Sequence, residues 1–189
     1  MTGNKIQFVL GGARSGKSQF AETLALDLFH AANKSSNAST AKLVYIATAE
    51  AFDEEMRARI DLHKGRRDSK WQLIDAPIEL PSMIRANDAA DNILLVDCTS
   101  VWITNLIINK INTDIYRKDL LSCLEKISGK IILVASETGL GIVPDNKLSR
   151  QFRDSNGLTN QAIAATAQTV FFLIAGIAQK IKTPNGPLA

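Results

Sequence analysis

The residues with the clearest chemical role occupy positions 11–18, which read Gly-Gly-Ala-Arg-Ser-Gly-Lys-Ser. This string is a complete G-x-x-x-x-G-K-[ST] phosphate loop, placed between an apolar run at 6–10 and a segment with helical spacing at 20–29. Glycines in such a loop let successive backbone N–H groups turn toward a phosphate at the positive end of the helix. Lys17 is expected to reach the β- and γ-phosphates, and Ser18 to bind Mg²⁺. Since both flanks fit, we interpret the loop as a nucleoside triphosphate site rather than a structural glycine-rich turn.

A phosphate loop is completed by a carboxylate that orients the metal from the end of a neighbouring strand. The string Asn-Ile-Leu-Leu-Val-Asp at 92–97 has this pattern, because four apolar residues lead directly to Asp97. Asp97 is therefore the Walker B candidate and is expected to orient Mg²⁺. A second interpretation makes Asp97 the N-cap of the following helix, since Thr99 and Ser100 beside it also cap well. The two roles are compatible.

The other candidate for catalysis is His63, one of two histidines in the chain. It follows a charged segment at 52–62 and falls on the apolar stripe of that segment at helical spacing. A histidine on such a stripe is often a packing residue, and His30 is interpreted as a polar residue at the end of the first helix. The basic stretch at 64–67 favours another role for His63, because cations neutralise a triphosphate and keep an imidazole unprotonated. A neutral imidazole can then attack a phosphate and carry a covalently bound nucleotide.

Composition indicates one globular domain. The chain has 189 residues, 46% hydrophobic and 22% charged, which is enough apolar material for a sizeable core. We expect a single P-loop nucleotide-binding catalytic domain at 1–182 and a flexible tail at 183–189, where two prolines and a glycine occur. The net charge of +3 is too small to indicate nucleic acid as a partner. With no signal peptide, no membrane span and no disulfide pattern for Cys98 and Cys123, we expect a cytoplasmic protein.

Strand-like apolar runs alternate with segments of helical spacing along the chain. This alternation is typical of an α/β fold with a doubly wound, mostly parallel sheet and helices on both faces. The expected strands are 6–10, 43–47, 72–74, 93–97, 131–135 and 170–175. The expected helices are 20–29, 52–63, 80–90, 101–109, 115–127 and 148–168. Small polar residues at 31–41 predict a mobile loop after the first helix.

Two classes of nucleotide-dependent protein lack support. A switch GTPase uses Asn-Lys-x-Asp to select guanine, whereas residues 146–149 read Asn-Lys-Leu-Ser. The D-x-x-G string at 154–157 lies inside the last helical segment. A recombinase-type motor uses a basic DNA-binding tract, and this short chain has no obvious one.

Two further segments have open interpretations. Residues 137–144 follow an expected strand and form either a cover over substrate or nucleotide, or a rigid connection. Arg150 and Arg153 lie on one side of a helix, where they either contact phosphates or a neighbouring subunit, or remain solvated. Trp71 and Trp102 are expected to be packing anchors.

Seven segments, taken in order, resemble one known family, the bifunctional adenosylcobinamide kinase / adenosylcobinamide-phosphate guanylyltransferases of cobalamin biosynthesis. They are Gly11-Gly12-Ala13-Arg14-Ser15-Gly16-Lys17-Ser18, Tyr45-Ile46-Ala47-Thr48-Ala49, Asp53-Glu54-Glu55-Met56 with Arg59-Ile60-Asp61-Leu62-His63, Asp97-Cys98-Thr99-Ser100-Val101-Trp102-Ile103-Thr104-Asn105-Leu106, Glu137-Thr138-Gly139-Leu140-Gly141-Ile142-Val143-Pro144, Arg150-Gln151-Phe152-Arg153-Asp154, and Asn160-Gln161. The series runs through nearly the whole chain and is far more specific than the phosphate loop alone.

The resemblance implies two reactions. In the first, the aminopropanol hydroxyl of adenosylcobinamide attacks the γ-phosphate of ATP or GTP. In the second, the histidine of the family attacks the α-phosphate of GTP, which releases pyrophosphate and leaves a GMP-histidine. Adenosylcobinamide phosphate then takes the GMP to give adenosylcobinamide-GDP. His63 occupies the matching position, so the implied catalytic residues are His63, Lys17 and Asp97, with Ser18 and Asp97 at Mg²⁺.

The resemblance also implies the nucleotide contacts and the assembly. The contacts fall on Gly11, Gly12, Ala13, Arg14, Ser15, Gly16, Lys17, Ser18, Ala47, Thr48, Ala49, Lys64, Gly65, Arg66, Arg67, Asp75 and Asp97. At Asp75 the family commonly has Glu. Its members have a P-loop NTPase-like (RecA-like) fold and look like propeller-shaped homotrimers.

Two simpler functions remain as alternatives at this point. One is a P-loop small-molecule kinase without guanylyltransferase activity, in which His63 is structural. The other is a non-catalytic nucleotide-binding module that signals through a partner. Guanylylation of the protein itself separates the bifunctional enzyme from the kinase, and slow or absent turnover with every cobinamide substrate would favour the module.

Overall fold

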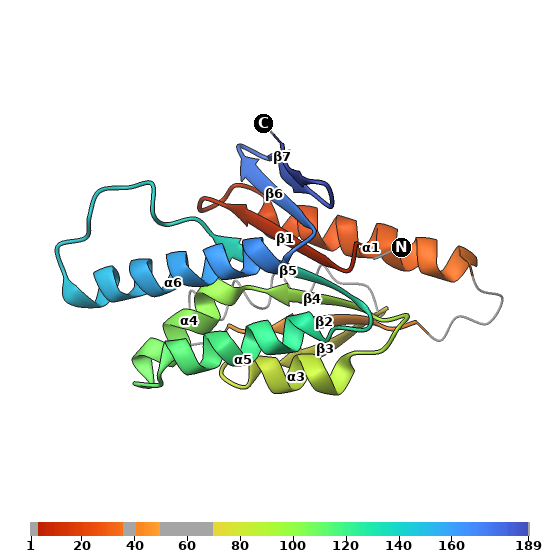
Figure 1. Cartoon of the computed structure of the whole chain (residues 1–189), viewed down its shortest axis with the longest axis horizontal. Helices are drawn as coiled ribbons and strands as arrows, with labels where there is room; N and C mark the ends of the chain where they lie inside the picture. The colour runs from red at the N-terminus through yellow and green to blue at the C-terminus, as the bar shows by residue number, and fades with distance from the viewer. Residues whose placement is uncertain (1–3, 36–40, 50–69, 189) are drawn as a thin grey trace.

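The computed structural model describes residues 4–35, 41–49 and 70–188. They share one sheet of eight strands in the order β3-β2-β4-β5-β1-β6-β7-β8 (Figure 1). The first six strands of this order are parallel, whereas β7 is antiparallel to β6 and β8 to β7. The strands are β1 Ile6–Gly11, β2 Leu43–Ala47, β3 Trp71–Asp75, β4 Ile93–Asp97, β5 Lys130–Ser136, β6 Thr169–Ile174, β7 Ile177–Thr183 and β8 Gly186–Pro187. The helices are α1 Lys17–Ser35, α3 Leu80–Asn87, α4 Thr99–Ile108, α5 Thr113–Glu125 and α6 Lys147–Thr166.

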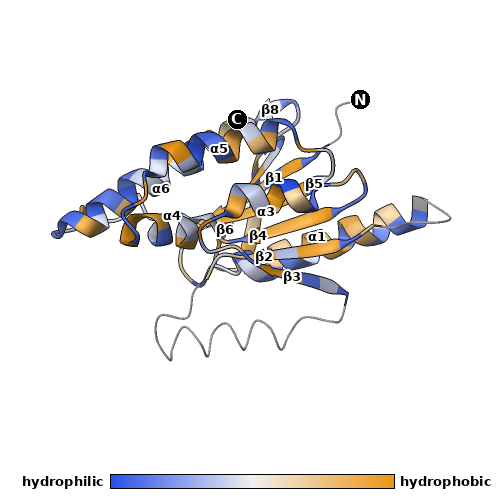
Figure 2. Cartoon of the chain, turned by 90° about the horizontal axis from the view of Figure 1, so that it is seen from below, coloured by the Kyte–Doolittle hydropathy of each residue, from blue (hydrophilic) through white to orange (hydrophobic). Residues whose placement is uncertain are grey.

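The central strands are buried on both faces because side chains alternate from one face to the other along a strand. In β4, Leu94 and Val96 pack under α3, α4 and α6, while Ile93 and Leu95 pack against α1. Helix α5 forms an outer layer against α3 and α6. Figure 2 shows the hydrophobic residues concentrated on these central strands, and more hydrophilic residues on the outer helices. The predicted α/β class with a doubly wound, mostly parallel sheet is confirmed.

Strand β5 lies between the strand of the phosphate loop and the strand of the Walker B candidate. Gly11 of β1 is in register with Ser136, and Asp97 of β4 is in register with Val134. Parallel strands present their carboxyl ends at one edge of the sheet, which is where ligands bind in doubly wound folds. The sheet therefore brings residues about 85 positions apart in the chain to neighbouring places on one edge.

The six expected strands are all present, but the prediction for residues 31–41 needs correction. The loop expected at 31–41 is wrong for its first five residues, because α1 continues through Ser35. Ala31 and Ala32 are strong helix formers that favour continuation of the helix into the small polar residues at 33–35. Residues 36–40, and the helix expected at 52–63, lie outside the described residues.

Strand β7 was not predicted from the sequence. Ala175 and Gly176 have φ values of 52° and 82° and form the two-residue turn that pairs β7 back onto β6. Strand β7 is largely exposed, so its sequence carries little hydrophobic pattern, and Ile177 is 73% exposed. Residues 183–189 are expected from the sequence to form a flexible tail. Within them, Thr183 ends β7 and pairs with Gly186 of β8, so a second turn connects these two strands.

The last position of β1, Gly11, requires glycine for steric reasons. A Cβ there would lie 2.5 Å from the Leu173 carbonyl oxygen and 2.9 Å from Ser15 Oγ, whereas a Cβ at Gly12 would meet nothing within 4 Å. We therefore expect Gly11→Ala to destabilise the nucleotide-free protein by about 1–3 kcal/mol relative to Gly12→Ala. Both variants add one methyl group at a glycine, so comparing them removes the effect of that group on the unfolded chain. Urea unfolding without nucleotide measures the difference, and equal midpoints for the two variants would contradict the steric argument.

Candidate active site

The phosphate loop connects β1 to α1 by a compact turn. Arg14 and Gly16 both have positive φ, 54° and 90°, and α1 begins at Lys17. The loop is supported from the β6–β7 turn, where the Gly176 N–H donates to the Ser15 carbonyl at 3.1 Å. Ser15 Oγ is buried and has no hydrogen-bond partner among the described residues. A loop of this shape at a helix N-terminus binds a phosphate through its backbone N–H groups.

Lys17 is folded back over this loop. Its Nζ donates to the Gly12 carbonyl at 2.5 Å. Burial lowers the pKa of Lys17, while the neighbouring Cys98 and Asp97 oppose that shift. The ammonium group therefore lies partly desolvated at the loop, where the negative charge of a phosphate would stabilise it.

Asp97 lies at the end of β4 and is held by a hydrogen bond. The Tyr45 hydroxyl donates to Asp97 Oδ2 at 2.7 Å, and the Tyr45 ring packs edge-on against Trp71 at 5.7 Å between centroids. The N-cap of α4 is Cys98, so the alternative interpretation of Asp97 as that N-cap is wrong. Burial, with Asp97 alongside, raises the pKa of the Cys98 thiol to about 12. That thiol is therefore uncharged at neutral pH and is not a candidate nucleophile.

The end of β2 supports the position of Asp97. Thr48 Oγ1 donates to the Cys98 carbonyl at 2.8 Å and accepts from the Cys98 N–H at 3.0 Å. The Thr48 carbonyl in turn accepts from the amide of buried Asn105 at 2.8 Å, and the same amide donates to the Pro77 carbonyl at 3.0 Å. These bonds join the connections that follow β2, β3 and β4. Ala47 and Ala49 flank Thr48 at the same edge.

Asp75 lies on the same edge but farther from the phosphate loop. Ala47 is in register with Asp75 on one side and Asp97 on the other. Two strand spacings therefore separate the carboxylate-bearing residues, or about 10 Å of backbone. Asp75 is exposed at the end of the edge strand β3. Its position suits a contact to a part of the nucleotide other than the phosphates bound by Lys17.

The other residues considered from the sequence are either outside the described residues or have contacts of their own within the helices. His63, Lys64, Gly65, Arg66 and Arg67 lie outside the described residues. His30 is exposed near the far end of α1 and has a tilted ring contact with Phe29. Arg150 donates to the Pro144 and Asp145 carbonyls, and Arg153 pairs with Asp154. Both arginines therefore hold local structure in α6 and in the segment before it.

A buried polar network that sequence reasoning missed fixes the end of β5. Ser100 Oγ donates to Asn156 Oδ1 and accepts from the Ser136 N–H, both at 2.8 Å. The Ser136 carbonyl accepts from Asn156 at 2.9 Å and from Asn160 at 3.2 Å. Polar residues inside the expected helices are a weak sequence signal of such a network. Their hydrogen-bond partners lie on distant segments, so the sequence does not indicate which residues pair. The network ties α4 and α6 to the edge beside the phosphate loop.

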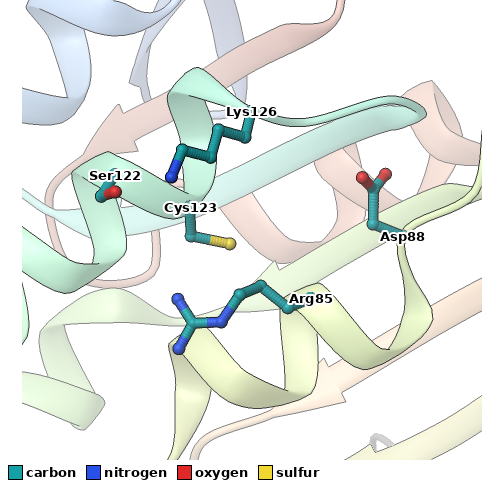
Figure 3. Close-up of a pocket in the computed structure, with 5 residues that line it drawn as sticks. All are labelled: Arg85, Asp88, Ser122, Cys123 and Lys126. Atoms are coloured by element: carbon teal, nitrogen blue, oxygen red, sulfur yellow. The ribbon is translucent and has the colours of Figure 1, made fainter.

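A pocket between α3 and α5 lies away from this edge. Figure 3 shows the residues that line it, Arg85, Asp88, Ser122, Cys123 and Lys126. The Asp88 carboxylate accepts from the N–H groups of Ser128 and Gly129, just before β5 begins, which places it at the opposite, amino edge of the sheet. Arg85 forms a two-bond ion pair with Asp119. Arg85 and Asp88 therefore already have bonded partners within the fold.

Comparison with known proteins decides the family. Residues 7–181 match the model of the cobinamide kinase / cobinamide phosphate guanyltransferase family. The chain belongs to this family. It is 42% identical over 176 residues to the bifunctional adenosylcobalamin biosynthesis protein CobP of Pseudomonas aeruginosa, covering 92% of this chain and 95% of that protein. It is 34% and 35% identical to the bifunctional proteins named CobU of Escherichia coli and Salmonella typhimurium, each over 92% of this chain and 98% of the relative.

Membership of the cobinamide kinase / cobinamide phosphate guanyltransferase family confirms the resemblance inferred from the motifs. The family description pairs a kinase with a guanylyltransferase, which favours the bifunctional interpretation over a kinase alone or a non-catalytic module. Helices of the length and apolarity needed to cross a bilayer do not occur in the described parts of the chain.

Lys17→Met tests the ligand role of the buried ammonium group. In wild type, a nucleotide at about 100 times its Kd should raise Tm by about 5–10 °C, and the variant should lose most of this shift. The nucleotide-free variant should be at least as stable as wild type at pH 7, because burying the charged Lys17 is unfavourable. Since burial lowers the pKa of Lys17 from its ordinary 10.5, this advantage should shrink as pH rises toward 10.5. Differential scanning fluorimetry measures both effects, with exposed Lys118→Met as control; an undiminished nucleotide shift in Lys17→Met would disprove the assignment.

Proposed function

We propose that this protein phosphorylates adenosylcobinamide with ATP or GTP and then transfers GMP from GTP, through a GMP-histidine intermediate, to adenosylcobinamide phosphate. The product is adenosylcobinamide-GDP. The observation that carries the proposal is the edge on which Lys17, folded over the phosphate loop, and Asp97, held by Tyr45, lie on either side of β5. Family membership supplies the chemical class of the acceptor.

In the kinase step, the phosphate loop holds the triphosphate through its backbone N–H groups and through Lys17. The substrate hydroxyl attacks the γ-phosphorus, and the bond from that phosphorus to the β-phosphate oxygen breaks. Lys17 stabilises the negative charge that develops on the transferred group and on the leaving nucleoside diphosphate. The protein mainly positions the two substrates and supplies positive charge, because phosphoryl transfer demands little other chemistry from it.

The donor set fits Mg²⁺. Ser18 provides a hydroxyl in the first turn of α1, and Asp97 provides a carboxylate whose orientation Tyr45 sets. Mg²⁺ prefers oxygen ligands and typically uses one or two protein side chains together with phosphates and water. When bound, Mg²⁺ would neutralise charge on the phosphate oxygens.

In the guanylyltransferase step, His63 is the proposed nucleophile. One imidazole nitrogen forms a bond to the α-phosphorus of GTP, and pyrophosphate leaves. A phosphate oxygen of adenosylcobinamide phosphate then attacks the same phosphorus and releases the imidazole. The basic residues at 64–67 would neutralise the triphosphate, while Ala47, Thr48, Ala49 and Asp75 would contact the nucleotide.

We also propose that the protein is a cytoplasmic homotrimer. Figure 1 shows the chain leaving β5 in a long arc before it returns as α6. Leu140 and Ile142 on this arc are 84% and 96% exposed, and Val143 and Leu148 are exposed beside them. Large apolar side chains gathered on one exposed segment are typical of surfaces that another chain covers. The free Cys98 and Cys123 fit a reducing compartment.

Labelling with GTP that carries ³²P at the α-phosphate tests the second half of the function. Wild-type protein with Mg²⁺ should retain acid-labile, alkali-stable label, and His63→Ala should retain none, because the nucleophile is missing. His30→Ala is the matched control and should label like wild type, since His30 is exposed on α1. An unlabelled wild-type protein would leave the kinase as the better interpretation.

Tyr45→Phe tests whether Asp97 serves the metal. The variant removes the hydrogen bond to Asp97 Oδ2 but keeps the ring that packs on Trp71. Loss of a group that orients a metal ligand commonly weakens metal affinity by about 10-fold or more. We expect a rise of that size in the Mg²⁺ concentration that half-saturates nucleotide binding, measured by titration at fixed nucleotide. Tyr116→Phe is the control, because its hydroxyl donates to Glu79 on the surface; equal half-saturation in the two variants would argue against the metal role.

A further inference from the structure

We propose that Glu137 is the general base of the kinase step, which takes the proton from the attacking hydroxyl. This inference rests on the proposed function. Glu137 is the first residue after β5, the strand between the phosphate-loop strand and the Asp97 strand. Its N–H donates to the Gly11 carbonyl at 3.0 Å, so the main chain at Glu137 runs directly beside the start of the phosphate loop.

Comparison with the other carboxylates on this edge favours Glu137. Asp75, Asp97 and Glu137 each end or directly follow a parallel strand. Asp97 accepts a hydrogen bond from the Tyr45 hydroxyl and is assigned to the metal. Asp75 lies two strand spacings beyond Asp97. Glu137 is the one of the three adjacent to β1, one strand spacing or about 5 Å of backbone from Gly11. Lys17, which binds the phosphates to be transferred, contacts the next residue, Gly12.

The side chain of Glu137 is held in a defined orientation. Its Oε1 accepts a hydrogen bond from the Gly139 N–H, and the residue is half-buried. Glycine at 139 permits this contact, because a Cβ there would lie 2.9 Å from Glu137 Oε1. The bond uses one carboxylate oxygen and leaves the other to accept a proton. Within the described ranges no ion pair to Glu137 occurs, so the carboxylate is oriented there without a neighbouring cation to neutralise it.

The backbone that carries Glu137 is also fixed. Both backbone polar groups of the preceding residue, Ser136, are bonded, its N–H to Ser100 and its carbonyl to Asn156 and Asn160. Catalytic groups need positional support of this kind, because a displacement of about 1 Å is costly in rate. The buried network that ties α4 and α6 to β5 thus fixes the backbone next to Glu137.

The proposed step balances in atoms and charge. As the hydroxyl oxygen of the substrate bonds to the γ-phosphorus, its proton moves to the free oxygen of Glu137. The bond between the γ-phosphorus and the bridging oxygen breaks, and the nucleoside diphosphate leaves with that electron pair. Glu137 later releases the proton to water. The GMP-transfer step needs no such base, because its acceptor is a phosphate oxygen that is already ionised.

Glu137→Gln separates the catalytic role from a structural one. The glutamine amide oxygen can still accept from Gly139, so the loop contact survives while the proton acceptor is lost. We expect kcat for phosphorylation of adenosylcobinamide to fall by about 10²-fold or more, with little change in KM for the nucleotide. GMP transfer to chemically supplied adenosylcobinamide phosphate should stay within about twofold of wild type. Glu125→Gln, an exposed carboxylate at the end of α5, is the control and should leave both activities intact.

Two results would overturn the inference alone. One is a Glu137→Gln enzyme that retains wild-type kinase kcat, and the other is a variant in which kinase and GMP transfer fall together, as a structural role predicts. A wild-type protein that phosphorylates no adenosylcobinamide would instead overturn the proposed function, and the inference with it. Failure of the two proposals is therefore distinguishable.

Discussion

The pairing of β5 between β1 and β4 is the constraint on which the site depends. Parallel pairing sets the register of Gly11 with Ser136 and of Asp97 with Val134. The phosphate loop and the Walker B carboxylate therefore lie on one edge, separated by one intervening strand. All three strands are buried hydrophobic segments, so their register is maintained by the core on both faces of the sheet. The packing that stabilises the core therefore also fixes the geometry of the site.

A second layer of constraint comes from buried polar side chains at that edge. Asn105 joins the connections after β2 and β3, and Ser100 with Asn156 fixes the end of β5. Buried polar groups cost stability unless they are hydrogen-bonded. Asn105 Oδ1, Asn160 Oδ1 and Ser15 Oγ are nevertheless buried without a partner in the described residues. Their positions in the site agree with the tendency of functional regions to sacrifice local stability.

The site also combines opposing electrostatic demands. Lys17 is partly buried beside Asp97 and the phosphate loop, and burial lowers its pKa. The nucleotide-free arrangement is therefore less favourable for that ammonium group than the liganded one, in which phosphates provide negative charge. The Cys98 thiol next to Asp97 is kept uncharged by its raised pKa and adds no competing negative charge. These features favour a site organised around its ligand.

The sequence by itself determined the phosphate loop, the strand ending at Asp97, the alternation that makes the sheet parallel, and the family. The first two are local patterns, and the other two are series of local patterns along the chain, because glycine spacing, apolar runs and helical periodicity are each readable within about 20 residues. The exposed strand β7 and the continuation of α1 through Ser35 escaped prediction, since a largely exposed strand has little hydrophobic signal and small polar residues also occur in helices. Only the tertiary structure decided that Tyr45 holds Asp97, that Asn156 braces Ser136, and that Glu137 lies beside Gly11. These contacts join residues 20 to 126 positions apart, and strand order and helix packing, which no local pattern encodes, bring them together.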